Sequence, residues 1–289
     1  MVPLIWLMEQ KVTYRVLDLS PRKDQANKPS ELIQVTGHEE LTLNARRSIT
    51  VLWHNAHRQG IAEGKDYTIE IEELIPGAHK GYESVEEAVV TLMKTLIVMQ
   101  LSDGSTRRVQ FLGGNDIDSP HRPAGVLTYS FDKRLVEILQ KSEIWGKISL
   151  PVLMSISSKY GISLYENVSQ WSGLTVKTTQ KLTLAEFREL LGIEKANYQE
   201  FGHLNHAVIK PVVRELNALA PFNITILPVK TGRKVTHIHI GWWVKNLEEN
   251  KAAWTEIHKS RIGRKARISD QVEYVIEPSP SASRLTKRS

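Results

Sequence analysis

The amino-acid sequence predicts an α+β protein built from two tandem winged-helix domains. Residues 182–244 encode a short helix, a basic helix and a basic β-hairpin, which is the order of a winged helix. A similar order of elements occurs about 110 residues earlier. Residues 1–150 hold 18 Lys and Arg against 20 Asp and Glu, whereas residues 151–289 hold 20 against 12. This excess of cations in the second copy indicates a polyanionic partner.

The first helix of the second copy is predicted at residues 183–191. Thr183 and Glu186 form a capping box, in which the hydroxyl and the carboxylate each accept a backbone N–H that the helix start leaves unpaired. Gly192 is a residue type that commonly ends a helix. The apolar positions between them recur at helical spacing and give the helix one buried face: Leu184, Phe187, Leu190 and Leu191.

A second helix is predicted at residues 203–219, and it carries hydrogen-bond donors on one face. Apolar residues repeat with the helical period on the other face. A helix of this kind, placed after a short helix, typically enters the major groove of DNA. Pro211 removes one helical hydrogen bond, so we expect a kink or a short first segment near it. The donor face consists of His203, His206, Lys210, Arg214 and Asn217, with Asn205 beside it.

A hairpin follows, with strands predicted at residues 223–229 and 235–244. Both segments are rich in β-branched and apolar residues, and Thr231 and Gly232 lie between them. Three cations surround the turn, namely Lys230, Arg233 and Lys234. Such a wing lies along the sugar-phosphate backbone, where cations supply affinity that does not depend on sequence.

The first copy repeats this order with a different charge. Helices are predicted at residues 41–58, 72–75 and 84–100, where Ser84 and Glu87 would form a second capping box, and a strand at 67–71. Strands at 106–112 and 126–131 would form its wing. The helix at 84–100 is fringed with glutamates, so we expect this domain to self-associate and to contact DNA more weakly. Its candidate DNA-binding cations are Arg46, Arg47, Arg107 and Arg108.

These patterns divide the chain into four parts. Residues 1–40 are an N-terminal extension, 41–150 the first winged-helix domain, 151–246 the second and main DNA-binding domain, and 247–289 a basic C-terminal helix with a disordered tail. Further helices are predicted at 131–142, 151–171 and 247–267, and the tail begins near Glu277.

Composition limits the classes of function. The chain has no cysteine, which excludes disulfides and thiolate zinc sites and favours a reducing cytoplasm. The apolar run at residues 1–8 is too short to cross a bilayer, so no membrane partner is expected. No cofactor is expected either, because residues 60–65 lack the spacing of a phosphate loop and Asp66 stands where a Mg²⁺-binding hydroxyl belongs.

The second copy contains a set of residues that is typical of one family: Ser158-Lys159-Tyr160, Leu164-Tyr165, Leu184, residues 187–193, Tyr198, Val208, Pro211 and residues 215–217. Through these residues it resembles the initiator Rep proteins of iteron-containing plasmids. The resemblance covers residues 150–244, whereas the first copy matches only in its order of elements. It implies that the protein binds direct repeats at a plasmid origin of replication and promotes opening of that origin. It implies further that the protein recruits the host helicase, its loader and host initiator proteins, and that a dimer represses the protein's own gene. It also implies that Lys210 and Arg214 lie on the DNA-reading helix, with Arg233 and Lys234 on the wing.

Three other interpretations compete with this one. His237 and His239 alternate as in metal-dependent nicking enzymes, but Tyr274 is the one tyrosine that follows them, and no second tyrosine or lysine accompanies it as such an enzyme requires. A zinc site built from these two histidines with His203 and His206 would lack thiolates. A tandem winged-helix transcriptional regulator would bind DNA in the same way, and would differ by meeting an inverted repeat. We therefore expect a DNA-binding protein that is not an enzyme.

Overall fold

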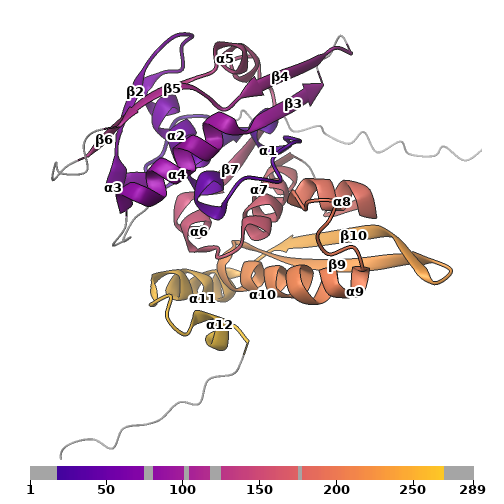
Figure 1. The fold of residues 1–289 in the computed structure, drawn as a ribbon. Coiled ribbons are helices and arrows are strands. Elements are labelled where there is room, and N and C mark those ends of the chain that lie inside the picture. The colour runs from indigo at the N-terminus through magenta and orange to yellow at the C-terminus, as the bar shows by residue number, and fades with distance from the viewer. Residues whose placement is uncertain (1–17, 75–80, 101–103, 118–124, 175–177, 270–289) are drawn as a thin grey trace, which may run out of the picture.

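The computed structural model describes residues 18–74, 81–100, 104–117, 125–174 and 178–269, and it confirms two domains that each combine helices with a small sheet (Figure 1). The predicted tail from Glu277 and the apolar run at residues 1–8 lie outside these residues. Among the helices of the described ranges, none is both long enough and apolar enough to cross a membrane.

The first domain is built around α2 (Leu43–Gln59), whose start is capped by the Thr42 hydroxyl accepting the N–H of Ala45. Strand β2 (Tyr67–Glu70), helix α3 (Ile71–Leu74) and helix α4 (Gly81–Lys94) follow, and a short helix α5 (Lys133–Leu139) closes the domain. Its core joins the buried faces of these elements and includes Trp53, Tyr67 and Phe111.

Two predictions for this domain were wrong. Helix α4 begins before Ser84 and ends at Lys94, and the predicted last turn is instead strand β3 (Leu96–Gln100), paired with β4 (Thr106–Gln110). The alternation of exposed Leu96 with buried Ile97 is a strand pattern, which the apolar run of the preceding helix hides. The wing strands are β5 (Leu112–Ile117) and β6 (Val126–Phe131), so β3–β4 is an additional hairpin inserted before the wing.

The sheets of the two domains have equivalent topologies. In the first domain the strand order is β2-β6-β5, and in the second it is β8-β10-β9, where β8 spans Thr179–Thr183, β9 Phe222–Thr231 and β10 Lys234–Val244. Each strand order places the last strand of the domain between the other two, and all pairs are antiparallel. The internal repeat predicted from the order of elements is therefore present in three dimensions.

The second domain begins with two helices in place of the single one predicted at 151–171. Helix α6 (Leu150–Ser155) ends at Ile156, which is extended, and α7 (Lys159–Leu174) starts after Ser158. The side chain of Glu215 accepts the backbone N–H of Ser157 at 2.9 Å, and so gives this N–H at the break a hydrogen-bond partner. A helical apolar pattern runs through the break because both helices pack on the same core.

The predicted capping box is confirmed at α8 (Leu184–Leu191). The Thr183 hydroxyl accepts the Glu186 N–H, and the Glu186 carboxylate accepts the Thr183 N–H at 2.7 Å. These hydrogen bonds to the charged form hold the pKa of Glu186 below its usual value. Gly192 adopts the left-handed conformation (φ +65°) that ends the helix. The C-terminal segment forms two helices, α11 (Leu247–His258) and α12 (Arg264–Arg267), instead of one.

The predicted N-terminal extension is incorrect for residues 25–33. Strand β1 (Gln25–Pro29) pairs along its whole length with β7 (Trp145–Ser149), and the short helix α1 (Ser30–Ile33) follows it. The indole N–H of Trp53 donates to the Asn27 carbonyl at 2.7 Å, which fastens β1 to α2. These residues join the two domains, a role that depends on a partner strand more than 100 residues away and leaves no local signature.

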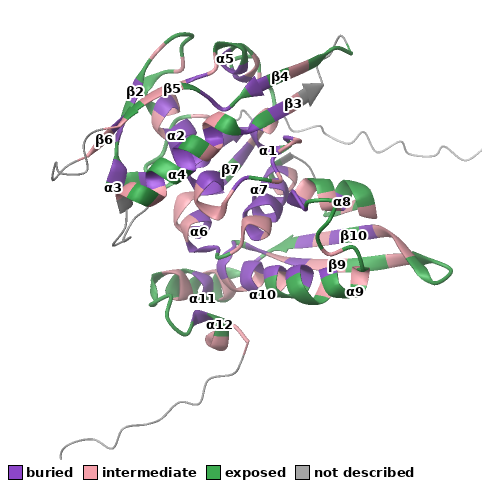
Figure 2. Cartoon of the chain, in the orientation of Figure 1, coloured by how far each residue is buried: buried purple, intermediate pink, exposed green. Residues whose placement is uncertain are grey.

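A buried ion pair holds the two domains together where α2 meets α7. Lys28 of β1 lies 2.7 Å from Glu166 of α7, and both side chains are almost fully buried. The Thr50 hydroxyl of α2 accepts from Lys28 at 2.9 Å and donates to Glu166 at 2.8 Å. Burial lowers the pKa of Lys28, and the adjacent carboxylate opposes that shift. Figure 2 shows α7 as a buried element between the domains.

We predict that removing one partner of this pair destabilises the protein more than removing both. Glu166→Leu leaves Lys28 buried without a counter-charge and should lower the free energy of unfolding by about 3–5 kcal/mol. The double variant Lys28→Met with Glu166→Leu should recover most of that loss, as measured by urea unfolding. Lys141→Ala, which breaks an exposed pair with Glu137, is the control and should change stability by no more than about 1 kcal/mol. Equal losses in the single and double variants would contradict the interpretation.

Candidate nucleic-acid interface

The predicted recognition helix is present, and it presents polar side chains on one face. It consists of α9 (Phe201–Leu204), a π-helical turn (Asn205–Ile209) and α10 (Lys210–Leu219). The opposite face is buried against the core of the second domain. The exposed face carries His203, His206, Lys210 and Arg214, as the sequence predicted.

The expected irregularity near Pro211 takes the form of this π-helical turn. The N–H of Lys210 donates to the carbonyl of Asn205, five residues earlier, which widens the turn ahead of Pro211. A proline ring clashes with the preceding turn of a regular α-helix. The wider turn relieves that clash and lets the helix continue, so the exposed face runs without interruption from His203 to Arg214.

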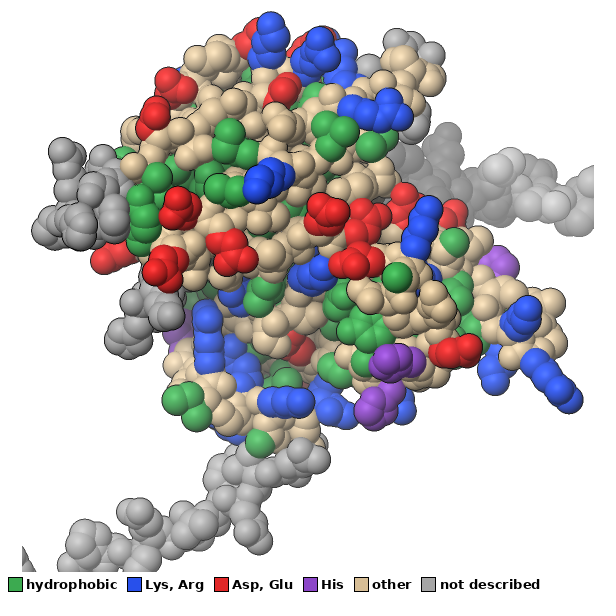
Figure 3. All heavy atoms as spheres, in the orientation of Figure 1, with side chains coloured by type: hydrophobic (Ala, Val, Ile, Leu, Met, Phe, Trp, Pro, Cys, Tyr) green, Lys and Arg blue, Asp and Glu red, His purple; other side chains and the backbone are tan. Residues whose placement is uncertain are grey.

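The wing extends from the recognition helix as predicted. Lys230, Arg233 and Lys234 are exposed at the tip of the β9–β10 hairpin, and Gly232 at the turn has a φ of +63°. Figure 3 shows Lys and Arg side chains at this tip and histidines beside them over α9 and its neighbouring turn. Pro228 lies in β9, an edge strand, where a missing N–H costs no ladder hydrogen bond. Helix and wing therefore form one continuous polar surface.

Asn217 has a structural role instead of the DNA contact that we predicted. Its side chain accepts the backbone N–H of Ile224 at 2.7 Å and donates to the carbonyl of the same residue at 3.1 Å. These bonds fasten α10 to β9 and use both ends of the amide. Asn205 is half-buried in the π-helical turn, and its expected contact with DNA stays a prediction.

Arg46 and Arg47, which we predicted to contact DNA, are instead buried where the domains meet, so neither lies on an exposed DNA-binding surface of the first domain. Arg46 donates to the carbonyl of His38 at 3.0 Å and to the hydroxyl of Ser163. Arg47 donates to the carbonyl of Ile156 at 2.5 Å. Burial lowers the pKa of each guanidinium to about 10. Two adjacent arginines on an amphipathic helix look the same in sequence whether they face DNA or another domain.

Arg107 and Arg108 lie on β4 of the inserted hairpin, and not on a wing. Arg107 forms an ion pair with Glu137 of α5 at 3.0 Å, while Arg108 is exposed. On the recognition-like helix α4 of the same domain, Glu83, Glu86 and Glu87 are exposed. The first domain therefore offers fewer exposed cations to DNA phosphates than the sequence suggested.

The four histidines of the proposed zinc site are divided between two elements. His203 packs edge-on against the ring of Tyr198, and the Nδ1 atom of His237 lies 3.0 Å from the Thr236 hydroxyl. Within the described ranges, no three His, Asp or Glu residues are grouped so that they could hold a metal ion. Tyr274, the nucleophile that a nicking reaction would need, lies outside those ranges.

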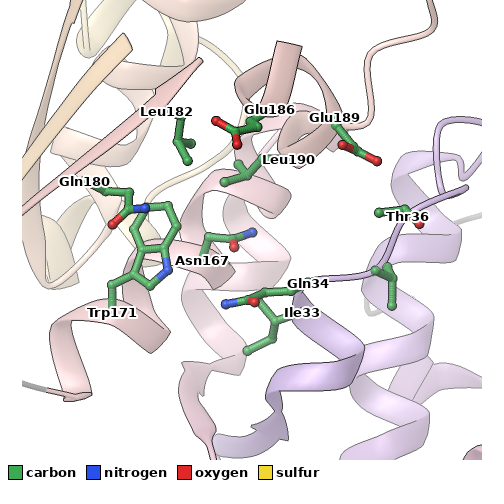
Figure 4. Close-up of a pocket in the computed structure, with 11 residues that line it drawn as sticks. Ile33, Gln34, Thr36, Asn167, Trp171, Gln180, Leu182, Glu186, Glu189 and Leu190 are labelled. Carbon is green, nitrogen blue, oxygen red and sulfur yellow. The ribbon is translucent and has the colours of Figure 1, made fainter. Parts of the chain in front are cut away.

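A depression of about 240 Å³ lies between residues 33–36 and the second domain (Figure 4). Trp171 of α7, Gln180 of β8 and the carboxylates Glu186 and Glu189 of α8 surround it. Its lining residues include no Lys or Arg, so this depression does not attract phosphate.

Sequence reasoning missed one group of residues beside the recognition helix. Arg261 and Lys265 of the C-terminal segment line a cleft of about 520 Å³ together with Pro211 and Arg214 of α10. The run of cations at residues 259–267 is visible in the sequence, but its position next to the recognition helix depends on the fold.

Two family models match the chain in its two domains. The model described as "Initiator Replication protein, WH1" matches residues 25–169, and the model described as "Initiator Rep protein, WH2" matches residues 183–242. The chain belongs to the initiator Rep protein family. The first match begins at β1, in agreement with the pairing of β1 with β7. The recognition helix and the basic wing lie within the second match.

The chain is also similar to individual proteins. A replication initiation protein of Escherichia coli is 32% identical over 107 residues, a match that covers 36% of this chain and 32% of that protein. The chain thus matches about a third of the length of this curated relative. The crystal structure of Pi initiator protein in complex with iteron DNA shares the fold, with a TM-score of 0.60 and 17% identity over 78% of this chain and 98% of that one. A structure of domains 2 and 3 of RctB has a TM-score of 0.44 at 14% identity and covers 71% and 81% of the two chains.

We predict different effects for the helix and the wing in this Rep protein. Arg214→Ala should weaken binding to the specific site by about 1–3 kcal/mol and relax the preference at one base pair, because an arginine on a recognition helix reads base edges. Lys234→Ala should weaken binding to all DNA sequences alike, and it should lower the slope of log K against log salt concentration by about 1. Fluorescence titrations with a specific and a scrambled duplex measure both, and Lys251→Ala on α11 is the charge-matched control. Unchanged affinity of the Arg214 variant would remove that residue from the interface.

Proposed function

We propose that this Rep protein initiates plasmid replication by binding several direct repeats at an origin through its second winged-helix domain. The carrying observation is the continuous exposed surface of His203, His206, Lys210 and Arg214 that leads to the wing cations. The helix supplies donors for base edges, and the wing supplies cations for phosphate. Iteron DNA is bound by the Pi initiator protein, which shares this fold.

Binding of several adjacent repeats would concentrate the protein at one place on the plasmid, promote opening there and recruit host helicase, loader and initiator proteins. These steps take place in the cytoplasm, on plasmid DNA. They require no catalytic group of this chain, and we propose that it neither hydrolyses ATP nor nicks DNA. A transcriptional regulator with the same domains would differ in the arrangement of its sites.

Footprinting on a supercoiled plasmid that carries the gene and its flanks tests this function. We expect protection of several head-to-tail copies of one short sequence near the gene, with the plasmid still supercoiled in the presence of Mg²⁺. Protection of a single inverted repeat would favour the regulator. Relaxation of the plasmid that is lost with His237→Ala would show a nicking enzyme.

We also propose that the first domain supplies a dimer contact, which would serve to repress the protein's own gene. Strand β4 pairs with β3 on one side, and in the described part of the sheet no strand pairs with its other side. The backbone N–H of Val98 on β3 donates to the carbonyl of Thr36, so it points away from β4. Arg108 is the residue of β4 directly opposite Val98. In an antiparallel pair of this kind, the backbone N–H of Arg108 also points away from the partner strand, toward the open edge of β4. A second copy could extend the sheet at this edge.

Arg108→Pro should weaken the dimer, because it removes an outward N–H while leaving the β3–β4 hydrogen bonds in place. Sedimentation of the full chain over a range of concentrations measures the effect. Arg108→Ala keeps the N–H and removes the same charge, so it should dimerise like the unaltered protein. A loss of dimer in both variants would assign the effect to the side chain and contradict the edge-strand contact.

A further inference from the structure

The cleft beside the recognition helix, which we call the α10–α12 cleft, combines parts of both domains. Its walls come from α10, from the break between α6 and α7, from the segment at residues 261–269, and from α2 of the first domain through Arg47. At about 520 Å³ it is larger than the depression of Figure 4 and, unlike it, is lined by several cations.

The charge of this cleft is unbalanced. Arg47, Arg214, Arg261, Arg264 and Lys265 line it, against one carboxylate, Glu215. Glu215 is buried and already accepts the Ser157 N–H. Arg264 is partly neutralised by Glu256 at 3.5 Å, but Lys265 forms no ion pair with any described residue.

Arg47 supplies a second, independent sign of a missing anion. It is 9% exposed, and its Nε atom has no hydrogen-bond partner among the described residues. Burial, followed by the positive charge of Arg261, lowers its pKa to about 10. A buried guanidinium with an unused donor next to other cations is costly unless an anion reaches it.

The position of the cleft relative to the recognition helix identifies the source of that anion. Residues 201–219 extend over about 28 Å at about 1.5 Å per residue. Figure 1 shows the wing tip beyond α9 at one end of this length, and α12 below α11 toward the other. A helix in the major groove, which is about 12 Å wide, lies between two rows of phosphates. Pro211 and Arg214 belong both to the exposed helix face and to the cleft lining, so a duplex on the helix passes the mouth of the cleft.

We propose that the α10–α12 cleft binds the sugar-phosphate backbone of the duplex that the recognition helix enters, beside the π-helical turn and α10 and away from the wing tip. Arg261 and Lys265 are exposed and contact phosphates at the mouth of the cleft, and Arg47 lies deeper. The second domain then holds the DNA backbone at two places, the wing and the α10–α12 cleft. This proposal rests on the proposed function, because it requires a duplex on α9–α10.

The salt dependence of DNA binding tests the proposal. With the full chain and a duplex that contains one protected repeat, Lys265→Ala should lower the slope of log K against log salt by about 1, and Arg261→Ala with Lys265→Ala by about 2. Lys133→Ala with Lys251→Ala removes the same charge from α5 and α11 and should leave the slope unchanged. Arg261→Lys with Lys265→Arg keeps both charges and should restore the slope.

Arg261 also donates to the carbonyl of Met154 at 2.9 Å, so its loss could release the C-terminal segment. The single Lys265 variant avoids this, because no hydrogen bond of its side chain joins it to another described residue. An unchanged slope in the Lys265 variant and the double variant would overturn the proposal. Calorimetric titration with pyrophosphate is a second measurement. If pyrophosphate binding requires Arg261 and Lys265 while the salt slope of DNA binding is unchanged in their variants, the cleft binds a free phosphate ligand and not the DNA backbone.

Failure of this proposal and failure of the proposed function give different results. If only the cleft proposal fails, the unaltered protein still prefers the repeat over a scrambled duplex. If the proposed function fails, that preference is absent in the unaltered protein.

Discussion

The buried ion pair between Lys28 and Glu166 is the contact on which the arrangement of the two domains depends. It joins β1 to α7, with Thr50 of α2 between them, and both charged residues lie within the first family match. Charges withdrawn from water must be fully paired to be tolerated, so this contact permits few alternative geometries. Arg46 adds a second connection between α2 and α7 through Ser163. Helix α4 packs against α2 and α10 packs against α7, so both recognition-like helices contact the helices that meet at this junction.

The junction also explains why the two similar domains present different surfaces. Arg46 and Arg47 of α2 are buried where the domains meet, and Arg107 is paired with Glu137, so several cations of the first domain serve internal contacts. The exposed face of α4 begins with glutamates. In the second domain, the corresponding helix and wing keep their cations exposed. Two copies of one fold thus differ in electrostatics, and the second presents more exposed cations on its helix and wing than the first does.

Within the second domain, two local structural features keep the basic surface continuous. The π-helical turn lets the recognition helix pass Pro211 without a break, and Asn217 fixes the end of that helix to β9. The bidentate amide contact explains why a polar residue on the predicted donor stripe does not face solvent. The C-terminal segment then places further cations beside α10.

Features that depend on neighbouring residues were predictable from the sequence. The capping box at Thr183, the left-handed Gly192, the exposed donors of α9–α10 and the cationic wing all follow from periodicity and turn chemistry, and the resemblance to plasmid initiators rested on the same segments. The tertiary structure alone decided what depends on distant partners. The pairing of β1 with β7, the ion pair across 138 positions and the burial of Arg47 arise because chain segments meet in space, and charged residues look alike in sequence whether they meet water, DNA or another domain.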